Sequence, residues 1–152
     1  EKLMLPHLRA GHIVLADRYI YTAYARDIAR GCDPSWLKNL YKFAAKPDIA
    51  FYFKAPLEIS LSRILTGRDE IKYHEAGMDL GLSKDTVESF KLFQGIIKTQ
   101  YDRMAKPEGF TVMDATKNIE EQQAEMRLIV EKNLAGYVPP VKIWQKAPEC
   151  PT

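Results

Sequence analysis

Short apolar runs alternate with stretches of helical periodicity along this chain, and this alternation constrains the fold more than any other feature. The runs span residues 12–16, 49–53 and 110–113, and a charged residue follows each of them directly. Continuous apolar runs of this length predict strands that are buried on both faces, as in parallel sheets. Strands that alternate with helices predict an α/β fold with a parallel sheet and right-handed crossovers.

Helix-start signals lie between these runs. An Asp-Pro pair at 33–34 predicts a helix with an N-cap residue and a proline in its first turn. Pro56 opens a second predicted helix. A third is predicted over residues 83–105, where apolar residues recur every three or four positions. Asn118 is followed three residues later by Glu121, which predicts a capping box at the start of the last helix.

Composition excludes several classes of function. Lys and Arg number 22 against 20 Asp and Glu, and the net charge of +2 argues against a nucleic-acid partner or binding to an anionic membrane surface. No apolar run approaches the roughly 18 residues that cross a bilayer. Cys32 and Cys150 lie far apart with no His cluster nearby. We therefore expect no disulfide framework and no metal-ligand set, and we predict a cytoplasmic protein.

The predicted domain covers residues 1–138, and the proline-rich residues 139–152 are predicted to be a tail or linker. Residues 66–82 contain three glycines and mixed charge with little periodicity, which is typical of a functional loop. The chain begins at Glu1 without a methionine or a recognisable signal peptide. From these ends we expect a segment of a longer protein.

Charged residues at the ends of the predicted strands are the first candidates for a site, because ligands of α/β proteins bind outside the carboxyl ends of the strands. These residues are Asp17, Arg18, Lys54 and Asp114. An arginine can bind phosphate oxygens through two parallel hydrogen bonds, and a neighbouring carboxylate can orient it or a magnesium-bound water. Asp17 and Arg18 could equally form a buried ion pair at the start of the next helix.

Five segments, in the same order over residues 8–135, resemble the thymidylate kinase family. The first, residues 10–19 with Thr22 and Ala25, is similar to the family's Asp-Arg-Tyr-x-x-Ser-x-x-Ala segment, and the second, residues 46–53 with 56–59, is similar to its Pro-Asp, strand and Pro-x-Glu segment. The third consists of Arg63 and Arg68, which are similar to the arginines that enter the lid, and the fourth, residues 73–80, is similar to the lid of some bacterial members. The fifth, residues 113–115 followed by 119–121, is similar to the end of the pattern.

This resemblance implies a P-loop kinase-like α/β fold and phosphoryl transfer from ATP, with Mg²⁺, to a deoxynucleoside monophosphate such as dTMP. The implied catalytic residues, with Arg18 holding the acceptor phosphate, are Arg18, Arg68 and Asp17. The implied substrate-binding residues are Tyr19, Thr22, Arg26, Tyr73 and Glu75. The implied ATP-binding residues are Arg63, Asp114, Ala115 and Thr116. Members commonly dimerise through helices, so a homodimer with Trp36 and Trp144 as candidate interface residues is also implied. Trp144 lies in the tail and could equally dock on the domain.

The sequence departs from the family pattern in two places. The family's Gly-x-x-x-x-Gly-Lys phosphate loop and its strand are missing, since none of the eight glycines is followed by lysine. We therefore expect no competent ATP site in this chain alone. Because sheet edges would be left unpaired, we also expect self-association or marginal stability. Arg26 and Asp27 replace a Tyr-Gln pair that helps many members recognise thymine. Another nucleotide or deoxynucleoside kinase of this fold, or a non-catalytic domain for oligomerisation or regulation, is the alternative.

Overall fold

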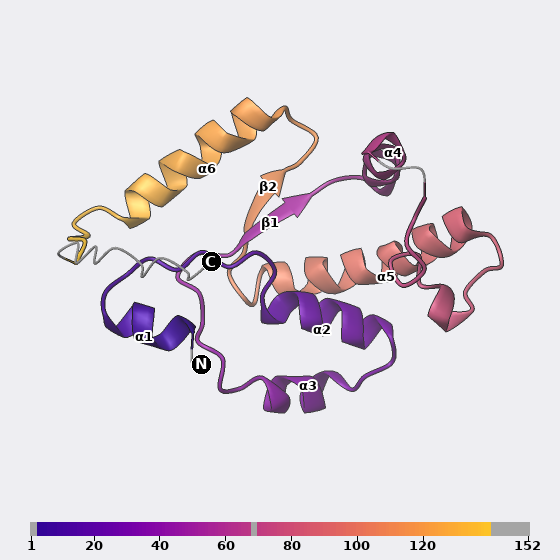
Figure 1. The fold of residues 1–152 in the computed structure, drawn as a ribbon, viewed down its shortest axis with the longest axis horizontal. Helices are drawn as coiled ribbons and strands as arrows, with labels where there is room; N and C mark the ends of the chain where they lie inside the picture. The colour runs from indigo at the N-terminus through magenta and orange to yellow at the C-terminus, as the bar shows by residue number, and fades with distance from the viewer. Residues whose placement is uncertain (1–2, 68–69, 141–152) are drawn as a thin grey trace, which may run out of the picture.

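Helices alternate with two short strands over residues 3–67 and 70–140, which are the residues that the computed structural model describes (Figure 1). In chain order the elements are α1 (Met4–Arg9), α2 (Ile20–Ala29), α3 (Pro34–Leu40), β1 (Phe51–Lys54), α4 (Leu57–Gly67), the 3-10 helix η1 (Met78–Leu80), α5 (Thr86–Ala105), β2 (Thr111–Asp114) and α6 (Ile119–Asn133). No described helix is long and apolar enough to cross a membrane.

The two described strands form a parallel sheet. β1 pairs with β2 in a register that runs from Phe51 opposite Thr111 to Lys54 opposite Asp114. The chain between them passes through α4 and α5, which is the crossover that a parallel pair needs. The predicted α/β fold with a parallel sheet is confirmed, and the carboxyl ends of the two strands lie together.

The first predicted strand, residues 12–16, is wrong. These residues form no strand, and Ile13 and Leu15 are 52% and 93% exposed. A strand needs a neighbour that accepts its backbone hydrogen bonds. Within the described residues the sheet consists of β1 and β2 alone, so this apolar run has no partner there. The short helix α1, which precedes it, was not predicted.

The helix-start signals are confirmed at their side chains. Asp33 accepts a hydrogen bond from the backbone N–H of Trp36 at 2.7 Å, and Asn118 with Glu121 forms the predicted capping box. The longest helix starts at Thr86, later than predicted, because Asp85 serves as its N-cap.

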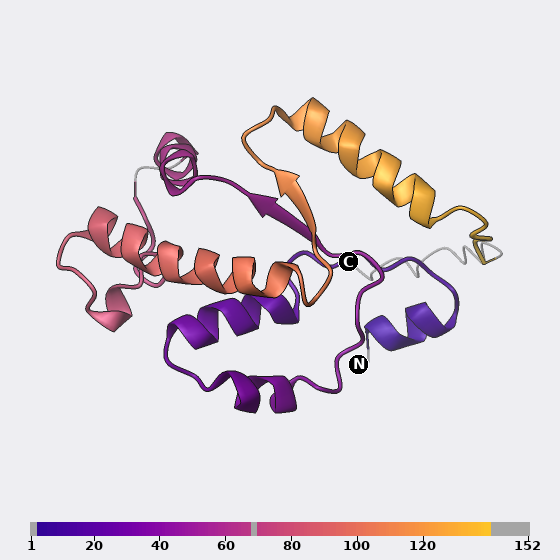
Figure 2. The ribbon, with the colours of Figure 1, turned by 180° about the vertical axis from the view of Figure 1, so that it is seen from behind.

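The described core lies where α2 packs against α5. Ala25 from α2 and Phe93 and Ile97 from α5 form one buried cluster, and Tyr21, Tyr24 and Leu37 form a second one between α2 and α3. Figure 2 shows α2 between α3 and α5, with the sheet on the other side of α5 and α6 beyond the sheet. The packing of α2 against α5 therefore sets the relative positions of the candidate residues that these two helices carry.

Candidate functional site

The backbone turns at Asp17 and Arg18, directly before α2. Arg18 has a φ of 57°, and it is the only non-glycine residue with a positive φ in the described part of the chain. For such a residue the left-handed conformation costs about 1–3 kcal/mol, and it is found mostly at functional sites. Both residues are exposed, and within residues 3–67 and 70–140 neither side chain forms a hydrogen bond or an ion pair. The alternative of a buried Asp-Arg pair is therefore wrong.

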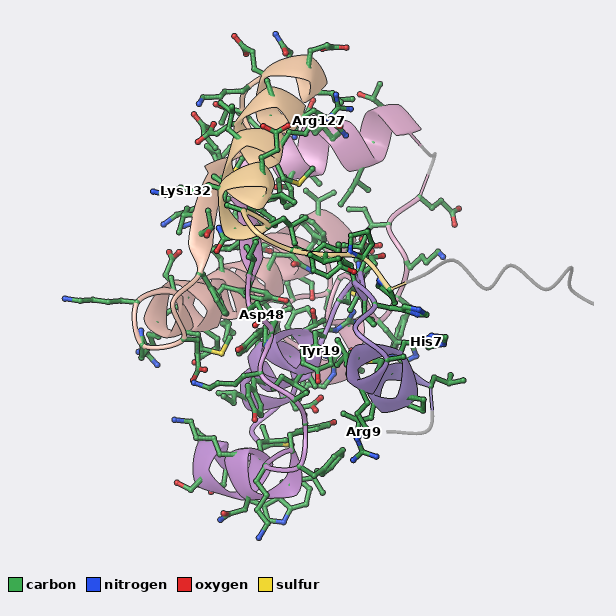
Figure 3. All side chains as sticks on the ribbon, turned by 90° about the vertical axis from the view of Figure 1, so that its left-hand side faces the viewer. His7, Arg9, Tyr19, Asp48, Arg127 and Lys132 are labelled. Atoms are coloured by element: carbon green, nitrogen blue, oxygen red, sulfur yellow. The ribbon has the colours of Figure 1, made fainter. Side chains whose placement is uncertain are left out.

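The N-terminus of α2 is open beside Arg18. Tyr19 occupies the N-cap position, but its side chain forms no cap hydrogen bond. Its hydroxyl instead donates to the backbone oxygen of Ala45 at 2.9 Å, next to an apolar groove of about 170 Å³ that α1 also lines (Figure 3). The first N–H groups of a helix lack intrahelical partners and attract anions. Arg18 and this helix end can therefore receive one anion together.

Thr22, Arg26 and Arg30 follow one another at four-residue intervals along one side of α2, with Arg30 at the residue that caps the helix C-terminus. We call these three residues the α2 face. The hydroxyl of Tyr101 on α5 donates to Oγ1 of Thr22 at 3.0 Å, so this face is turned toward α5. Arg26 is half-buried. Two of the predicted substrate-binding residues are thereby brought together on one face of a helix.

Residues 72–81, the docked segment, pack on α5 instead of forming an open loop. The buried Ser89 donates its hydroxyl to the backbone oxygen of Ala76 at 2.8 Å. The side-chain amide of Gln94 donates to the backbone oxygen of Glu75 at 2.9 Å. This part of the predicted lid is held in place by side chains of α5.

Close packing at Gly77 sets the path of the docked segment. Gly77 has a φ of 67°, and a Cβ atom there would lie 2.5 Å from Cγ of Phe93. Only glycine fits, because a side chain would meet both the positive φ and the ring. Nearby, the Tyr73 side chain is 59% exposed, and its ring makes an edge contact with His74 at 5.2 Å between centroids. Tyr73 is thus accessible, and its position follows from the backbone of the segment.

Arg30 joins α2 to the docked segment. Its Nε donates to Oδ2 of Asp79 at 3.1 Å, and its Nη2 donates to the backbone oxygen of His74 at 3.1 Å. The guanidinium also lies over the Phe93 ring, 4.6 Å from the centroid. The hydrogen bond from Arg30 lowers the pKa of Asp79. Arg30 is not among the residues predicted from the sequence, because Asp79 is 49 residues away and no local pattern pairs them. The four-residue spacing from Arg26 was the one available signal.

At the sheet edge, Lys54 is engaged by a carboxylate. Its Nζ lies 2.8 Å from Oδ1 of Asp102, while Nζ of Lys98 lies 3.1 Å from Oδ2. Burial acts to raise the pKa of Asp102, but the hydrogen bonds from both lysines outweigh it and lower the pKa. The Tyr52 hydroxyl donates to the same carboxylate at 3.3 Å, and burial together with this negative charge raises its pKa. This cluster fastens β1 to α5.

The predicted ATP-binding residues 114–116, at the carboxyl end of β2, form a closed turn. Thr116 donates its hydroxyl and its backbone N–H to Oδ1 of Asp114, at 2.7 and 2.9 Å. These hydrogen bonds lower the pKa of Asp114. Thr116 is exposed and Ala115 is buried. Among the described residues, no hydrogen bond or ion pair joins this turn to α2 or the docked segment.

Of the two predicted lid arginines, the structure describes only Arg63. Arg63 is exposed on α4, and Arg68 lies outside the described residues. An open hollow of about 440 Å³ lies between α4 and α5, lined by Glu58, Leu61, Ser62, Leu65, Thr66 and Lys91. Its described lining includes none of the predicted site residues.

Two features of the chain bear on how it could hold ATP and a metal ion. The described residues contain no group of three or more His, Cys, Asp or Glu side chains that could hold a metal. None of the eight glycines precedes a lysine, so the sequence lacks the loop that wraps nucleotide phosphates. Asp17 is a single exposed carboxylate, which could contact the water shell of a hydrated Mg²⁺ only with help from substrate phosphates.

Comparison with known proteins gives a consistent set of matches. A family model described as thymidylate kinase matches residues 1–126. Probable thymidylate kinase 2 of Saccharolobus solfataricus is 40% identical over 131 residues, which are 86% of this chain and 62% of that protein. The thymidylate kinase of Sulfurihydrogenibium sp. is 35% identical over 126 residues, 80% of this chain and 55% of its own length. A probable thymidylate kinase of Thermococcus kodakarensis is 47% identical over 64 residues, 42% of this chain and 31% of that protein. This chain therefore spans less than two thirds of these relatives.

Proposed function

Because the chain belongs to the thymidylate kinase family, we propose that it supplies the acceptor side of a phosphoryl transfer from ATP to dTMP. Arg18 binds the acceptor phosphate, and Asp17 orients its guanidinium. In a transfer of this kind the protein contributes positioning and charge stabilisation, with little covalent chemistry of its own.

The observation that carries this proposal is the conformation of Arg18. Its backbone is held at a φ of 57°, and its side chain is exposed with no partner within the described residues. The uncapped N-terminus of α2 begins two residues later. An anionic phosphate there would accept charge-assisted hydrogen bonds from the guanidinium and hydrogen bonds from the free helix N–H groups.

The nucleoside of the acceptor is proposed to lie along the α2 face. Thr22 and Arg26 belong to that face, and Tyr73 and Glu75 approach from the docked segment. Arg26 is half-buried where many relatives carry a residue that helps read thymine. This substitution favours, as a second candidate, an acceptor with a base other than thymine.

The donor side is proposed in coarser terms. ATP supplies the phosphoryl group, and Arg63, Arg68 and residues 114–116 are its proposed contacts. Because the residues present form no phosphate cradle, we derive no step through ATP or Mg²⁺. We expect this chain alone to bind dTMP and to transfer no phosphoryl group from ATP.

The deciding experiment is calorimetric titration of the chain with dTMP, with thymidine and with dCMP, dAMP and dGMP. We expect dTMP to bind and thymidine, which lacks the phosphate, to bind at least tenfold more weakly. Arg18→Ala should weaken dTMP to the level of thymidine. Arg127→Ala is the matched control, because Arg127 bonds only to Gln123 on α6 among the described residues (Figure 3). Equal affinity of the wild type for dTMP and thymidine would refute the phosphate assignment, and tighter binding of another monophosphate would select the second candidate.

The implied homodimer is proposed to form through α3. Trp36 and Leu40 lie four residues apart on this helix, and they are 57% and 45% exposed. Large apolar side chains gathered on one exposed helix face favour burial against a second surface.

A further inference from the structure

The Arg30 side chain connects the end of α2 to the docked segment and to α5. It extends from the end of α2 to the carboxylate of Asp79, to the backbone oxygen of His74 and to the ring of Phe93 on α5. Nε and Nη2 both donate to the Asp79 carboxylate, and Nη2 also donates to the His74 carbonyl. A lysine ammonium cannot reproduce this geometry. Figure 1 shows the segment around η1 beside the N-terminal half of α5, near the end of α2.

The contact with His74 has a direct consequence for its neighbours. Tyr73 and Glu75 flank His74 in the chain, so a hydrogen bond to the His74 carbonyl restrains the backbone on which both side chains are carried. Tyr73 is largely exposed, and the ring contact that the structure gives it is with His74 itself. Its position therefore depends on the backbone.

Arg30 also belongs to the α2 face, four residues beyond Arg26 and eight beyond Thr22. The contacts of α5 with Ala76 and Glu75 hold the docked segment on α5, while Arg30 links the same segment to α2. Arg30 is therefore a direct link between the docked segment and α2, in addition to the path through α5.

We propose that Arg30 is a positioning residue that fixes the docked segment to α2, so that Tyr73 and Glu75 keep constant positions relative to Thr22 and Arg26. This inference rests on the proposed function for its consequence, acceptor binding, but its structural part can be measured without a ligand. The side chains proposed to hold the acceptor then keep their relative positions before the nucleotide binds, which lowers the ordering cost of binding.

Hydrogen exchange of the full chain tests the structural part. The N–H groups of Ala76 and Met78 are bonded within the segment, to Lys72 O and Tyr73 O at 2.9 and 3.2 Å. In Arg30→Ala these amides should exchange about tenfold faster, the scale expected when a charge-assisted hydrogen bond is lost under partial solvent screening. Amides of α6 should not change, and Arg127→Ala should leave the segment as in the wild type.

Two further variants separate the hydrogen-bond geometry of the Arg30 guanidinium from its charge. Arg30→Lys keeps the charge but loses the two-acceptor geometry, so it should restore only part of the protection. Asp79→Asn keeps the shape and removes the ion pair, so it should speed exchange less than Arg30→Ala. It also gives a folded comparison should Arg30→Ala unfold. Unchanged exchange in both Arg30→Ala and Asp79→Asn would overturn the proposal.

Titration with dTMP tests the consequence. Arg30→Ala should raise the Kd for dTMP about tenfold, with Arg127→Ala unchanged. Faster exchange with an unaltered Kd would overturn the positioning role. A wild-type chain that binds no dTMP would be a failure of the proposed function, and the exchange result would then decide by itself whether Arg30 fixes the segment.

Discussion

Replacing Arg18 by glycine and by alanine separates the strain in its backbone from the role of its side chain. At a φ of 57°, a residue with a Cβ atom bears a penalty of about 1–2 kcal/mol, which glycine avoids. Glycine loses about 0.5–1 kcal/mol through the greater freedom of the unfolded chain. We therefore expect Arg18→Gly to be more stable than Arg18→Ala by about 1 kcal/mol.

The assay is thermal unfolding of the two variants side by side. For a chain of this size, about 1 kcal/mol corresponds to roughly 2–4 °C in Tm. Arg18→Gly should thus melt about 2–4 °C above Arg18→Ala, while both variants lose dTMP affinity equally. Because the side chain makes no described contact, its removal alone should change the stability little.

The outcome that would refute this reasoning is specific. If Arg18→Gly melts at or below Arg18→Ala, the backbone at this position is not left-handed in solution. If the stability difference is found but dTMP binds both variants as it binds the wild type, the strain is real and serves something other than phosphate binding.

Three further predictions concern the rest of the molecule. Gly77→Ala should lower the free energy of unfolding by about 2 kcal/mol or more in urea titration, because the added Cβ meets the Phe93 ring at 2.5 Å; a change below about 0.5 kcal/mol would contradict the packing. The pKa of Asp102 is lowered in the folded state, so the ionised carboxylate stabilises the fold above the ordinary pKa of 3.8, and this stabilisation is lost as the pH falls through the lowered pKa. Asp102→Asn should remove that part of the acid dependence of the urea midpoint, and an acid profile identical to that of the wild type would argue against it. Trp36→Ser should shift the chain toward monomer in size-exclusion chromatography with light scattering, and an unchanged mass would exclude α3 as the interface.

Features that depend on neighbouring residues were predictable from the sequence. Asp33 and Asn118 cap their helices as predicted because a cap is formed within one turn. The runs that became β1 and β2 were recognisable, and their parallel pairing followed from the helices between them. The start of α5 was predicted three positions too early, since Asp85 is its N-cap and Ser83 lies outside the helix, where its Oγ accepts from the backbone N–H of Asp85.

Features that depend on a residue far away in the chain were not predictable from the sequence. The run at 12–16 has strand character, yet it forms no strand because no described neighbour supplies its hydrogen bonds. The family resemblance pointed to Arg18, but the sequence contained nothing about its left-handed backbone or its exposure.

Short-range signals in the sequence predicted the helix caps, the runs that form β1 and β2 and the residue types at their ends, but not α1 or the absence of a strand at 12–16. Which of these residues meet follows from the packing of the folded chain. Arg30 and Asp79 are joined across 49 residues, and Ser89 reaches Ala76 only because α5 packs beside the docked segment. Local conformation follows from short-range sterics and capping that a sequence displays, whereas these contacts follow from the packing of α2 and α5, which the whole chain settles together.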